Sequence, residues 1–465
     1  MKKFAKRYTR HLSKTLNLLK RRDFEYLRHI LRKKSGINRS GEAEDKLKMY
    51  KYLETLLAGR EKSIPGENVL KAINNFQQGK AQIDSMPVIL DYCDTHLGCN
   101  ISPPCGKCFL PPMSKIVYNF TGNEFKGLEK ALICADVIIV GSLSEIMLDK
   151  NYPGIVNSMS TNETPRFSHI SNGVLIKNHV KNIVGKVRSI LVSLDAHIPG
   201  IYGKLQGKSM HLNLILSGLK DLADAKQKVG TRFPNVFLSF TISKENVDIF
   251  KDYYEYFLNP GYSIDVILLN RLNKFTNANP GRFREKFVFD FDEQIITDTT
   301  YFGIIKDLKK LSRNRKVLFF ELIDYLTCYP ILGKNNSSGF EGPVCPLPWI
   351  YMNCSIHGEV KLCCYSPTNL GNWREHGLDA VWNGKKMIRI RNQIANFGVA
   401  LECLQGSCPV VHKLRYILQQ ERVAYGIDDL KKDWRRYAPM IRPFIEEVCK
   451  GTLRETPVFF DNPGH

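Results

Sequence analysis

The chain has 465 residues, with a hydrophobic content of 43% and an aromatic content of 11%, which is the composition of a globular protein of two or three domains and excludes a disordered chain. No apolar run approaches the roughly 20 residues of a membrane-spanning helix. The basic N-terminus lacks the apolar segment of a signal peptide, so we expect a cytoplasmic protein. The formal net charge is +21, and residues 1–60 hold 18 Lys and Arg against 6 Asp and Glu. Such a block is either a solvated helical face or a contact surface for nucleic acid or another anionic partner.

The thirteen cysteines point to metal binding. Their odd number and the adjacent pair Cys363 and Cys364 argue against a disulfide framework. In a reducing cytoplasm, clustered thiols are more often metal ligands. Ten of the cysteines fall in two groups, at residues 93–108 and 345–408. The three others are expected to be small buried hydrophobes: Cys134, Cys328 and Cys449.

Residues 1–83 have apolar side chains at helical spacing, with a helix expected over Glu67–Gln78. From about residue 86 the pattern changes, because short apolar runs alternate with helical periodicity, which predicts βα repeats and a largely parallel sheet. The fold class is therefore α/β, a partial (βα)6 TIM-like barrel, with a long helix at His211–Lys228. The expected strands are Val88–Tyr92, Ala135–Val140, Arg166–Ile170, Ser189–Leu194, Val236–Ile242 and Ser263–Leu269.

The first cysteine group follows the first expected strand, with Cys99, Cys105 and Cys108 in one loop rich in Pro and Gly. Ligands of parallel barrels bind at the carboxyl ends of the strands, which is where this loop lies. Three thiolates with one open coordination position predict a catalytic metal or iron–sulfur site. Cys93 is a rival ligand, but its place at the strand end favours Cys99.

The second cysteine group follows a flexible linker at residues 333–339 and surrounds a glycine-marked hairpin. This arrangement predicts an iron–sulfur cluster or a zinc site. Cys364 is an alternative to Cys363 as a ligand, and Cys354 is either a packing residue or an additional ligand. The expected ligands are Cys345, Cys363, Cys403 and Cys408.

The sequence divides into five regions. They are a basic helical extension (1–83), the barrel (84–300), a connecting segment and linker (301–338), the cysteine-rich domain (339–415) and a helical tail (416–465).

The first cysteine loop resembles the T-x-x-C-N-L-x-C-x-x-C motif of radical S-adenosylmethionine (SAM) enzymes. Its C-x5-C-x2-C spacing is two residues longer than the usual C-x3-C-x2-C. Lys107 stands where the family usually has an aromatic residue near the adenine, and Phe109 follows the last cysteine instead. The resemblance implies a [4Fe–4S] cluster on Cys99, Cys105 and Cys108 whose fourth iron binds SAM.

Further matches follow in the family's order. Gly141 and Glu145 stand in place of the Gly-Gly-Glu-Pro motif after the second strand, although the Glu-Pro pair itself is missing. Asn172 lies in a turn similar to T-N-G-x-L after the third strand. Ser193 and Asp195 lie in a match to the fourth-strand S-I/L-D-G/A motif. The resemblance implies that these residues, with Phe109, bind SAM.

The C-terminal module resembles a SPASM-type domain in its phrases C-x-x-P-W and G-x-V-x-x-C-C, so the whole resemblance covers about residues 86–412. It implies a second, auxiliary [4Fe–4S] cluster and an electron donor such as flavodoxin or ferredoxin. It also implies reductive cleavage of SAM to a 5′-deoxyadenosyl radical that abstracts hydrogen from a substrate. A peptide or protein side chain is the favoured substrate, and a sugar, a lipid or another small molecule is the alternative. A second alternative is a catalytically degenerate, metal-stabilised binding or scaffold protein.

Overall fold

The computed structural model describes most of the expected barrel and C-terminal domain. The described residues are 63–94, 98–101, 105–106, 108, 123–160, 165–272, 291–311, 318–321, 345–366, 368–397, 400–404 and 408. The basic block before residue 63, Lys107, Phe109, the linker and the helical tail lie outside them, as do Cys328 and Cys449. Among the described helices, none is both long and apolar enough to cross a membrane.

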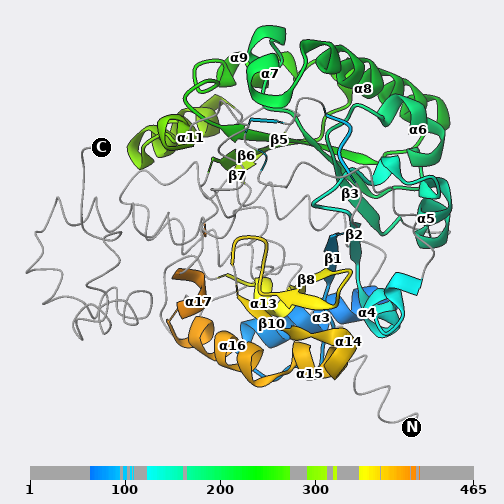
Figure 1. The fold of residues 1–465 in the computed structure, drawn as a ribbon, viewed down its shortest axis with the longest axis vertical. Coiled ribbons are helices and arrows are strands. Elements are labelled where there is room, and N and C mark those ends of the chain that lie inside the picture. Colours follow the sequence, from blue (N-terminus) through cyan, green and yellow to red (C-terminus); the bar gives the residue numbers. More distant parts are fainter. Residues whose placement is uncertain are drawn as a thin grey trace, which may run out of the picture.

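One curved sheet organises these residues, in the order β10-β9-β8-β1-β2-β3-β4-β5-β6-β7 (Figure 1). Neighbouring strands from β8 through β1 to β7 are parallel, and β9 pairs antiparallel with both β8 and β10. The strands are β1 (Ile89–Asp94), β2 (Val137–Val140), β3 (Phe167–Ser171), β4 (Ser189–Ser193), β5 (Asn235–Ile242), β6 (Val266–Arg271), β7 (Leu318–Glu321), β8 (Tyr351–Ser355), β9 (Glu359–Lys361) and β10 (Asn369–Asn372).

The predicted α/β partial barrel is confirmed, and its six expected strands lie within a few residues of β1 to β6. The sheet is larger than predicted at both edges. The segment 301–338, expected as a connector and linker, contributes the strand β7, which pairs with β6. At the other edge β8, from the cysteine-rich domain, pairs with β1, so the two expected domains share one sheet.

Helices follow the strands and cover one face of the sheet (Figure 1). The long helix expected over His211–Lys228 is α8, which ends at Gly230 in the left-handed conformation typical of helix C-termini. The helices along the barrel are α4 (Glu129–Cys134), α5 (Tyr152–Met159), α6 (Ile176–Ile183), α7 (Pro199–Gln206), α8 (Ser209–Val229), α9 (Phe250–Tyr256), α10 (Phe291–Gln294) and α11 (Asp298–Leu311). Short 3-10 turns lie at Asn123–Phe125, Ile146–Leu148 and Pro260–Tyr262.

Burial alternates along β4 and distinguishes the two faces of the sheet. Ile190 and Val192 are completely buried, whereas Ser189, Leu191 and Ser193 are half-buried. Since successive side chains of a strand point to opposite faces, the buried pair lies under the helices and the others line the inner face. The register carries the inner face across the sheet to Ser168 on β3, Ser239 on β5, and Ile139 and Asp91 on β2 and β1.

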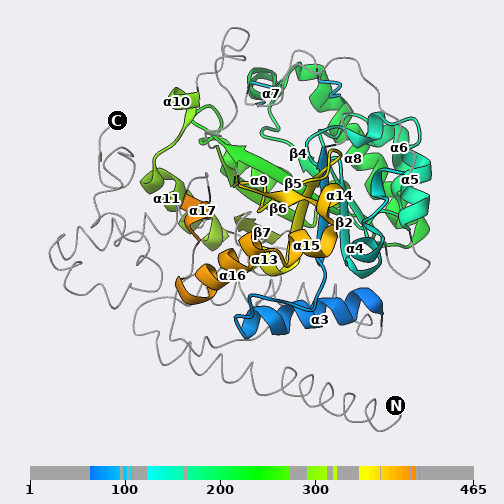
Figure 2. The same ribbon diagram turned by 60° about the horizontal axis from the view of Figure 1, so that its bottom comes forward.

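The C-terminal domain packs against the segment that precedes β1. Its helices are α13 (Leu347–Ile350), α14 (Trp373–His376), α15 (Leu378–Trp382), α16 (Lys385–Phe397) and α17 (Leu401–Leu404). The helix α3 (Ile64–Gln77) lies against α13 (Figure 2). The indole N–H of Trp349 donates to the Lys80 carbonyl at 2.7 Å, and that of Trp382 donates to the Ser85 carbonyl at 2.9 Å. The end of the predicted N-terminal extension is thus packed on the C-terminal domain.

Candidate functional site

The first cysteine loop lies at the carboxyl end of β1. Cys99 is exposed, and Cys105 and Cys108 are half-buried. Two backbone hydrogen bonds anchor the described parts of the loop, from Gly106 N–H to the Leu205 carbonyl at 3.0 Å and from Glu145 N–H to the Gly98 carbonyl at 3.1 Å. The loop is therefore held between the end of α7 and the segment after β2.

The three thiols of this loop lie close enough to influence common neighbours. Desolvation by surrounding atoms raises the pKa of Cys99, with smaller contributions from charge on Glu145 and then on Cys108. The pKa of Tyr202 on α7 is raised by burial, and then by charge on Cys105, Asp195 and Cys99. The predicted ligands therefore gather at one end of the barrel.

Glu145 and Asn172 connect this loop to the end of β3. The Glu145 side chain is 2% exposed, and burial raises its pKa to about 7. Its carboxylate accepts hydrogen bonds from the Ser171 hydroxyl at 3.0 Å and from the Asn172 backbone N–H at 2.8 Å. The Asn172 side-chain amide donates to Asn100 Oδ1 at 2.7 Å and to Cys99 Sγ at 3.6 Å. Both predicted SAM-binding side chains are thus engaged by the protein itself.

The other predicted SAM-binding residues lie at neighbouring strand ends. Gly141 directly follows β2 and has a φ of 73°, where the left-handed backbone suits glycine, and its N–H donates to the Tyr92 carbonyl. Ser193 is half-buried at the end of β4. Asp195 is buried, and its Oδ1 accepts the Thr241 N–H at 2.8 Å, so this carboxylate ties β4 to β5. Phe109 lies outside the described residues. SAM binding by this set remains a prediction.

The second cysteine group is more deeply buried. Cys363, Cys403 and Cys408 are buried, and Cys345 is half-buried. Burial raises the pKa of Cys363 to about 12, with a further contribution from charge on Cys408. The pKa values of Cys345 and Cys403 are raised by burial and then by charge on the other thiols of the group. Four thiols that oppose one another's ionisation in an apolar site suit a cation that binds thiolates.

The remaining cysteines are distinguished by their surroundings. Cys354 is buried on β8, and its pKa is raised by burial and then by charge on Cys93 and Asp91. The thiol of Cys93 donates to Asn353 Oδ1 at 3.4 Å, toward β8. Cys364 is exposed, and its pKa is raised by desolvation and then by charge on Cys363, Asp91 and Cys408. The choice of Cys99 over Cys93 and of Cys363 over Cys364 as ligands stays a prediction.

Sequence reasoning missed a buried polar cluster between β1 and β8. The Tyr351 hydroxyl donates to Asp91 Oδ2 at 2.5 Å, and Asn353 Nδ2 donates to the same oxygen at 3.1 Å. Asp91 is 4% exposed, and burial raises its pKa. The only signal in the sequence is an aspartate within the apolar run Val88–Tyr92, a position that requires a buried partner.

The described thiols of each group lie near one another but are not arranged as metal ligands. Among the residues that the structure describes, no group of three or more His, Cys, Asp or Glu side chains is placed to hold a metal ion. The donor chemistry nevertheless fits an iron–sulfur cluster, because both groups consist of cysteine thiols, the ligands that such clusters take.

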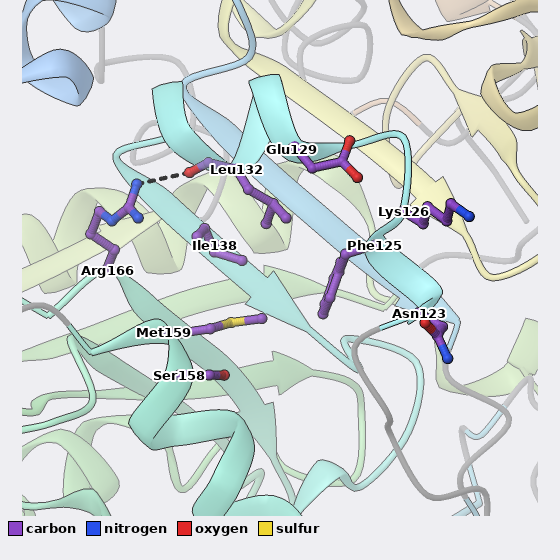
Figure 3. Close-up of a pocket in the computed structure, with 9 residues that line it drawn as sticks. All are labelled: Asn123, Phe125, Lys126, Glu129, Leu132, Ile138, Ser158, Met159 and Arg166. Carbon is purple, nitrogen blue, oxygen red and sulfur yellow. Dashed lines mark hydrogen bonds between the residues drawn. The ribbon is translucent and has the colours of Figure 1, made fainter.

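A cavity of about 470 Å³ lies elsewhere, between α4 and α5 at the face of β2 that the helices cover (Figure 3). Arg166 lines it, with its guanidinium donating to the carbonyl oxygens of Leu132 and Ala135 at 2.8 and 2.9 Å. None of its lining residues is a cysteine. The cavity is therefore separate from the cysteine site. The lining residues are Asn123, Phe125, Lys126, Glu129, Leu132, Ile138, Ser158, Met159 and Arg166.

Comparison with known proteins identifies the C-terminal domain and the fold. Residues 345–409 match the family model of SPASM, an iron–sulfur cluster-binding domain. The solved structure of SuiB from Streptococcus suis has a TM-score of 0.50 and 13% sequence identity, with 74% of this chain and 76% of that chain covered. SuiB bound to S-adenosylmethionine has a TM-score of 0.49 and 14% identity, covering 70% and 72% of the two chains.

A third solved structure is that of anSMEcpe with bound AdoMet and the Cp18Cys peptide. It has a TM-score of 0.44 and 15% identity, covering 70% of this chain and 87% of that chain. No curated protein matches the sequence.

The fold is similar to that of the solved structure of SuiB. Within this chain, the part that carries the identification is its SPASM domain at residues 345–409. The predicted resemblance is thus confirmed for the fold and for the C-terminal iron–sulfur domain.

Proposed function

We propose that this chain is a radical SAM enzyme in which Cys99, Cys105 and Cys108 hold a [4Fe–4S] cluster that binds SAM. The observation that carries the proposal is the position of this loop at the carboxyl end of β1, in a parallel barrel whose sheet continues into the SPASM domain. A [4Fe–4S] cluster held by these residues would supply the one electron that cleaves SAM to methionine and a 5′-deoxyadenosyl radical.

The chain's own residues position and enclose this chemistry. Cys99, Cys105 and Cys108 leave one position open for SAM, since three thiolates do not complete a four-ligand site. The inner face of the sheet forms one wall of the barrel, with Ser193 and Ser239 in register on β4 and β5. Hydroxyl groups on this wall are available to orient a polar substrate beside SAM.

The auxiliary cluster is proposed at Cys345, Cys363, Cys403 and Cys408. Their burial and mutual electrostatic effects support a shared cation. Zinc is the alternative occupant, because four-cysteine sites also bind zinc.

The proposed substrate is a peptide or protein side chain from which the radical abstracts hydrogen. This choice rests on the resemblance to SPASM-bearing enzymes, many of which modify ribosomally made peptides. A sugar, a lipid or another small molecule is the alternative. Flavodoxin or ferredoxin is the proposed electron donor, and the cytoplasm is the proposed compartment.

Anaerobic reconstitution tests the activity directly. We expect about eight irons per chain, as two four-iron clusters require, and release of 5′-deoxyadenosine when the reduced protein meets SAM. The Cys99→Ala/Cys105→Ala/Cys108→Ala variant should lose about four irons and all SAM cleavage. Cys134→Ala, which changes a half-buried cysteine outside both groups, is the matched control and should behave as the wild type.

Three outcomes would contradict parts of the proposal. SAM cleavage by the triple variant would show that the cluster site is wrong. One zinc per chain with no SAM binding would favour the metal-stabilised scaffold. Mass spectrometry of candidate peptides, sugars and lipids after turnover then separates the substrate classes, and a modified small molecule with unmodified peptides would overturn the peptide assignment.

A further inference from the structure

The turn after β3 is fixed on every side by hydrogen bonds. The Asn172 backbone N–H donates to Glu145 Oε2 at 2.8 Å, and the Ser171 hydroxyl donates to the same carboxylate. Gly173 N–H donates back to Ser171 Oγ at 2.8 Å, and Val174 N–H donates to Asn172 Oδ1 at 3.0 Å. The Asn172 side chain therefore has little freedom to turn.

This network also determines which end of the Asn172 amide faces the cysteine loop. Because Val174 N–H requires an oxygen acceptor, the amide oxygen points toward the turn and the NH2 group points away from it. One N–H reaches Asn100 Oδ1 at 2.7 Å, and Cys99 Sγ lies 3.6 Å from the same nitrogen. The Cys99 thiol thus accepts an N–H···S hydrogen bond from an amide whose orientation is fixed by its other hydrogen bonds.

Glu145 also contacts the cysteine loop directly. Glu145 N–H donates to the Gly98 carbonyl at 3.1 Å, one residue before Cys99. Glu145 therefore holds the loop through its backbone and the Asn172 turn through its buried carboxylate. Glu145 therefore fixes the positions of both the donor, Asn172, and the acceptor, Cys99, of the N–H···S hydrogen bond.

We propose that Asn172, oriented by Glu145, is a positioning residue that hydrogen-bonds the Cys99 sulfur and raises the reduction potential of the cluster held there. This inference rests on the proposed function and departs from the SAM-binding role that the motif resemblance implies. A hydrogen bond to a cluster sulfur stabilises the more negative, reduced state, so the donor eases the arrival of the electron that SAM cleavage needs.

The test is a redox titration of the reconstituted full-length chain. Electron paramagnetic resonance monitors the reduced SAM-binding cluster, whose signal is recognised because added SAM changes it. Asn172→Leu removes the donor at similar volume. Asn172→Asp keeps an oxygen for Val174 N–H but places a carboxylate beside Cys99. Asn178→Leu is the matched control, since Asn178 is exposed on α6, the helix that follows this turn.

We expect the midpoint potential to shift to more negative values in Asn172→Leu, and further in Asn172→Asp, while Asn178→Leu matches the wild type. The rate of 5′-deoxyadenosine formation should fall several-fold with an unchanged Kd for SAM. Glu145→Ala and Glu145→Gln both remove a carboxylate whose charge acts on Cys99, so they are compared with each other. Glu145→Ala, which also releases the turn, should have the more negative potential of the two, because Glu145→Gln keeps an acceptor for Asn172 N–H. Far-ultraviolet circular dichroism and iron content check that each variant folds and loads.

The outcomes separate this inference from the proposed function. An unchanged potential with a several-fold weaker Kd for SAM would show that Asn172 is a SAM ligand and would overturn the inference alone. Unchanged potential and unchanged Kd would overturn it as well. A wild-type chain that binds no iron would overturn both.

Discussion

The Tyr351 hydroxyl donates a hydrogen bond of 2.5 Å to the Asp91 carboxylate, across the boundary between the SPASM domain and the barrel. The two residues lie on β8 and β1, the neighbouring parallel strands where the domains share one sheet. Asp91 is buried, so this hydrogen bond compensates for a carboxyl group removed from water.

A double-mutant cycle measures this contact. Tyr351→Phe and Asp91→Asn should each destabilise the chain by about 1–3 kcal/mol, since each leaves a buried polar group without its partner. The double variant should lose about 1–2 kcal/mol less than the sum of the single losses. Urea unfolding monitored by tryptophan fluorescence gives the free energies. Strictly additive losses would show that the two side chains are not coupled.

Gly173 permits close packing behind the turn that carries Asn172. Its φ is +83°, and an added Cβ would lie 2.9 Å from Val192 Cγ1 and 3.1 Å from Ile215 Cγ2. Gly185 has a φ of +75° with no atom within 4 Å of an added Cβ. Gly185→Ala should therefore cost about 1 kcal/mol from backbone strain alone. Gly173→Ala should cost about 1–3 kcal/mol more, because the side chains of Val192 and Ile215 must also shift to make room for the added methyl group. Equal losses in thermal or urea unfolding would contradict the packing argument.

Acid should destabilise the fold through His169. This buried imidazole lies 2.9 Å from the Tyr152 hydroxyl, and burial lowers its pKa from 6.5 to about 3. Between these values the unfolded chain binds a proton that the folded chain does not bind. Stability is therefore lost as the pH falls below 6.5, up to roughly 4 kcal/mol by pH 3.

His169→Gln, which keeps a hydrogen-bonding group for Tyr152, should flatten this dependence between pH 6.5 and 4. Urea midpoints across that range measure it, and His357→Gln at an exposed position is the control. A pH profile parallel to that of the wild type would show that His169 is not the titrating group.

The adjacent cysteines in the SPASM domain should differ in iron binding. Cys363 is buried, whereas Cys364 is exposed; charge on Cys408 acts on both thiols, and charge on Asp91 acts on Cys364. Cys363→Ser should lose about four irons per chain, and Cys364→Ser should lose none. Iron analysis after anaerobic reconstitution distinguishes them. The reverse result would assign Cys364 as the ligand.

The strands, the long helix and the two cysteine groups could be predicted from the sequence. These features are local, because alternating apolar runs and a 3.6-residue period are written in neighbouring residues, and the spacing of clustered thiols needs no fold to be recognised. The expected strand that became β5 and the helix that became α8 were found for this reason.

Contacts between residues far apart in the chain could not be predicted and are seen only in the folded structure. The pairing of β8 with β1 joins positions about 260 residues apart, and the sequence placed them in separate domains. The contacts of Glu145 and Asn172 were equally beyond the sequence: the structure shows their polar atoms hydrogen-bonded to Ser171, Asn100 and Cys99, and SAM binding by them stays a prediction. A buried polar group takes whichever partner the packing brings within reach, and that choice is made by contacts between segments far apart in the chain.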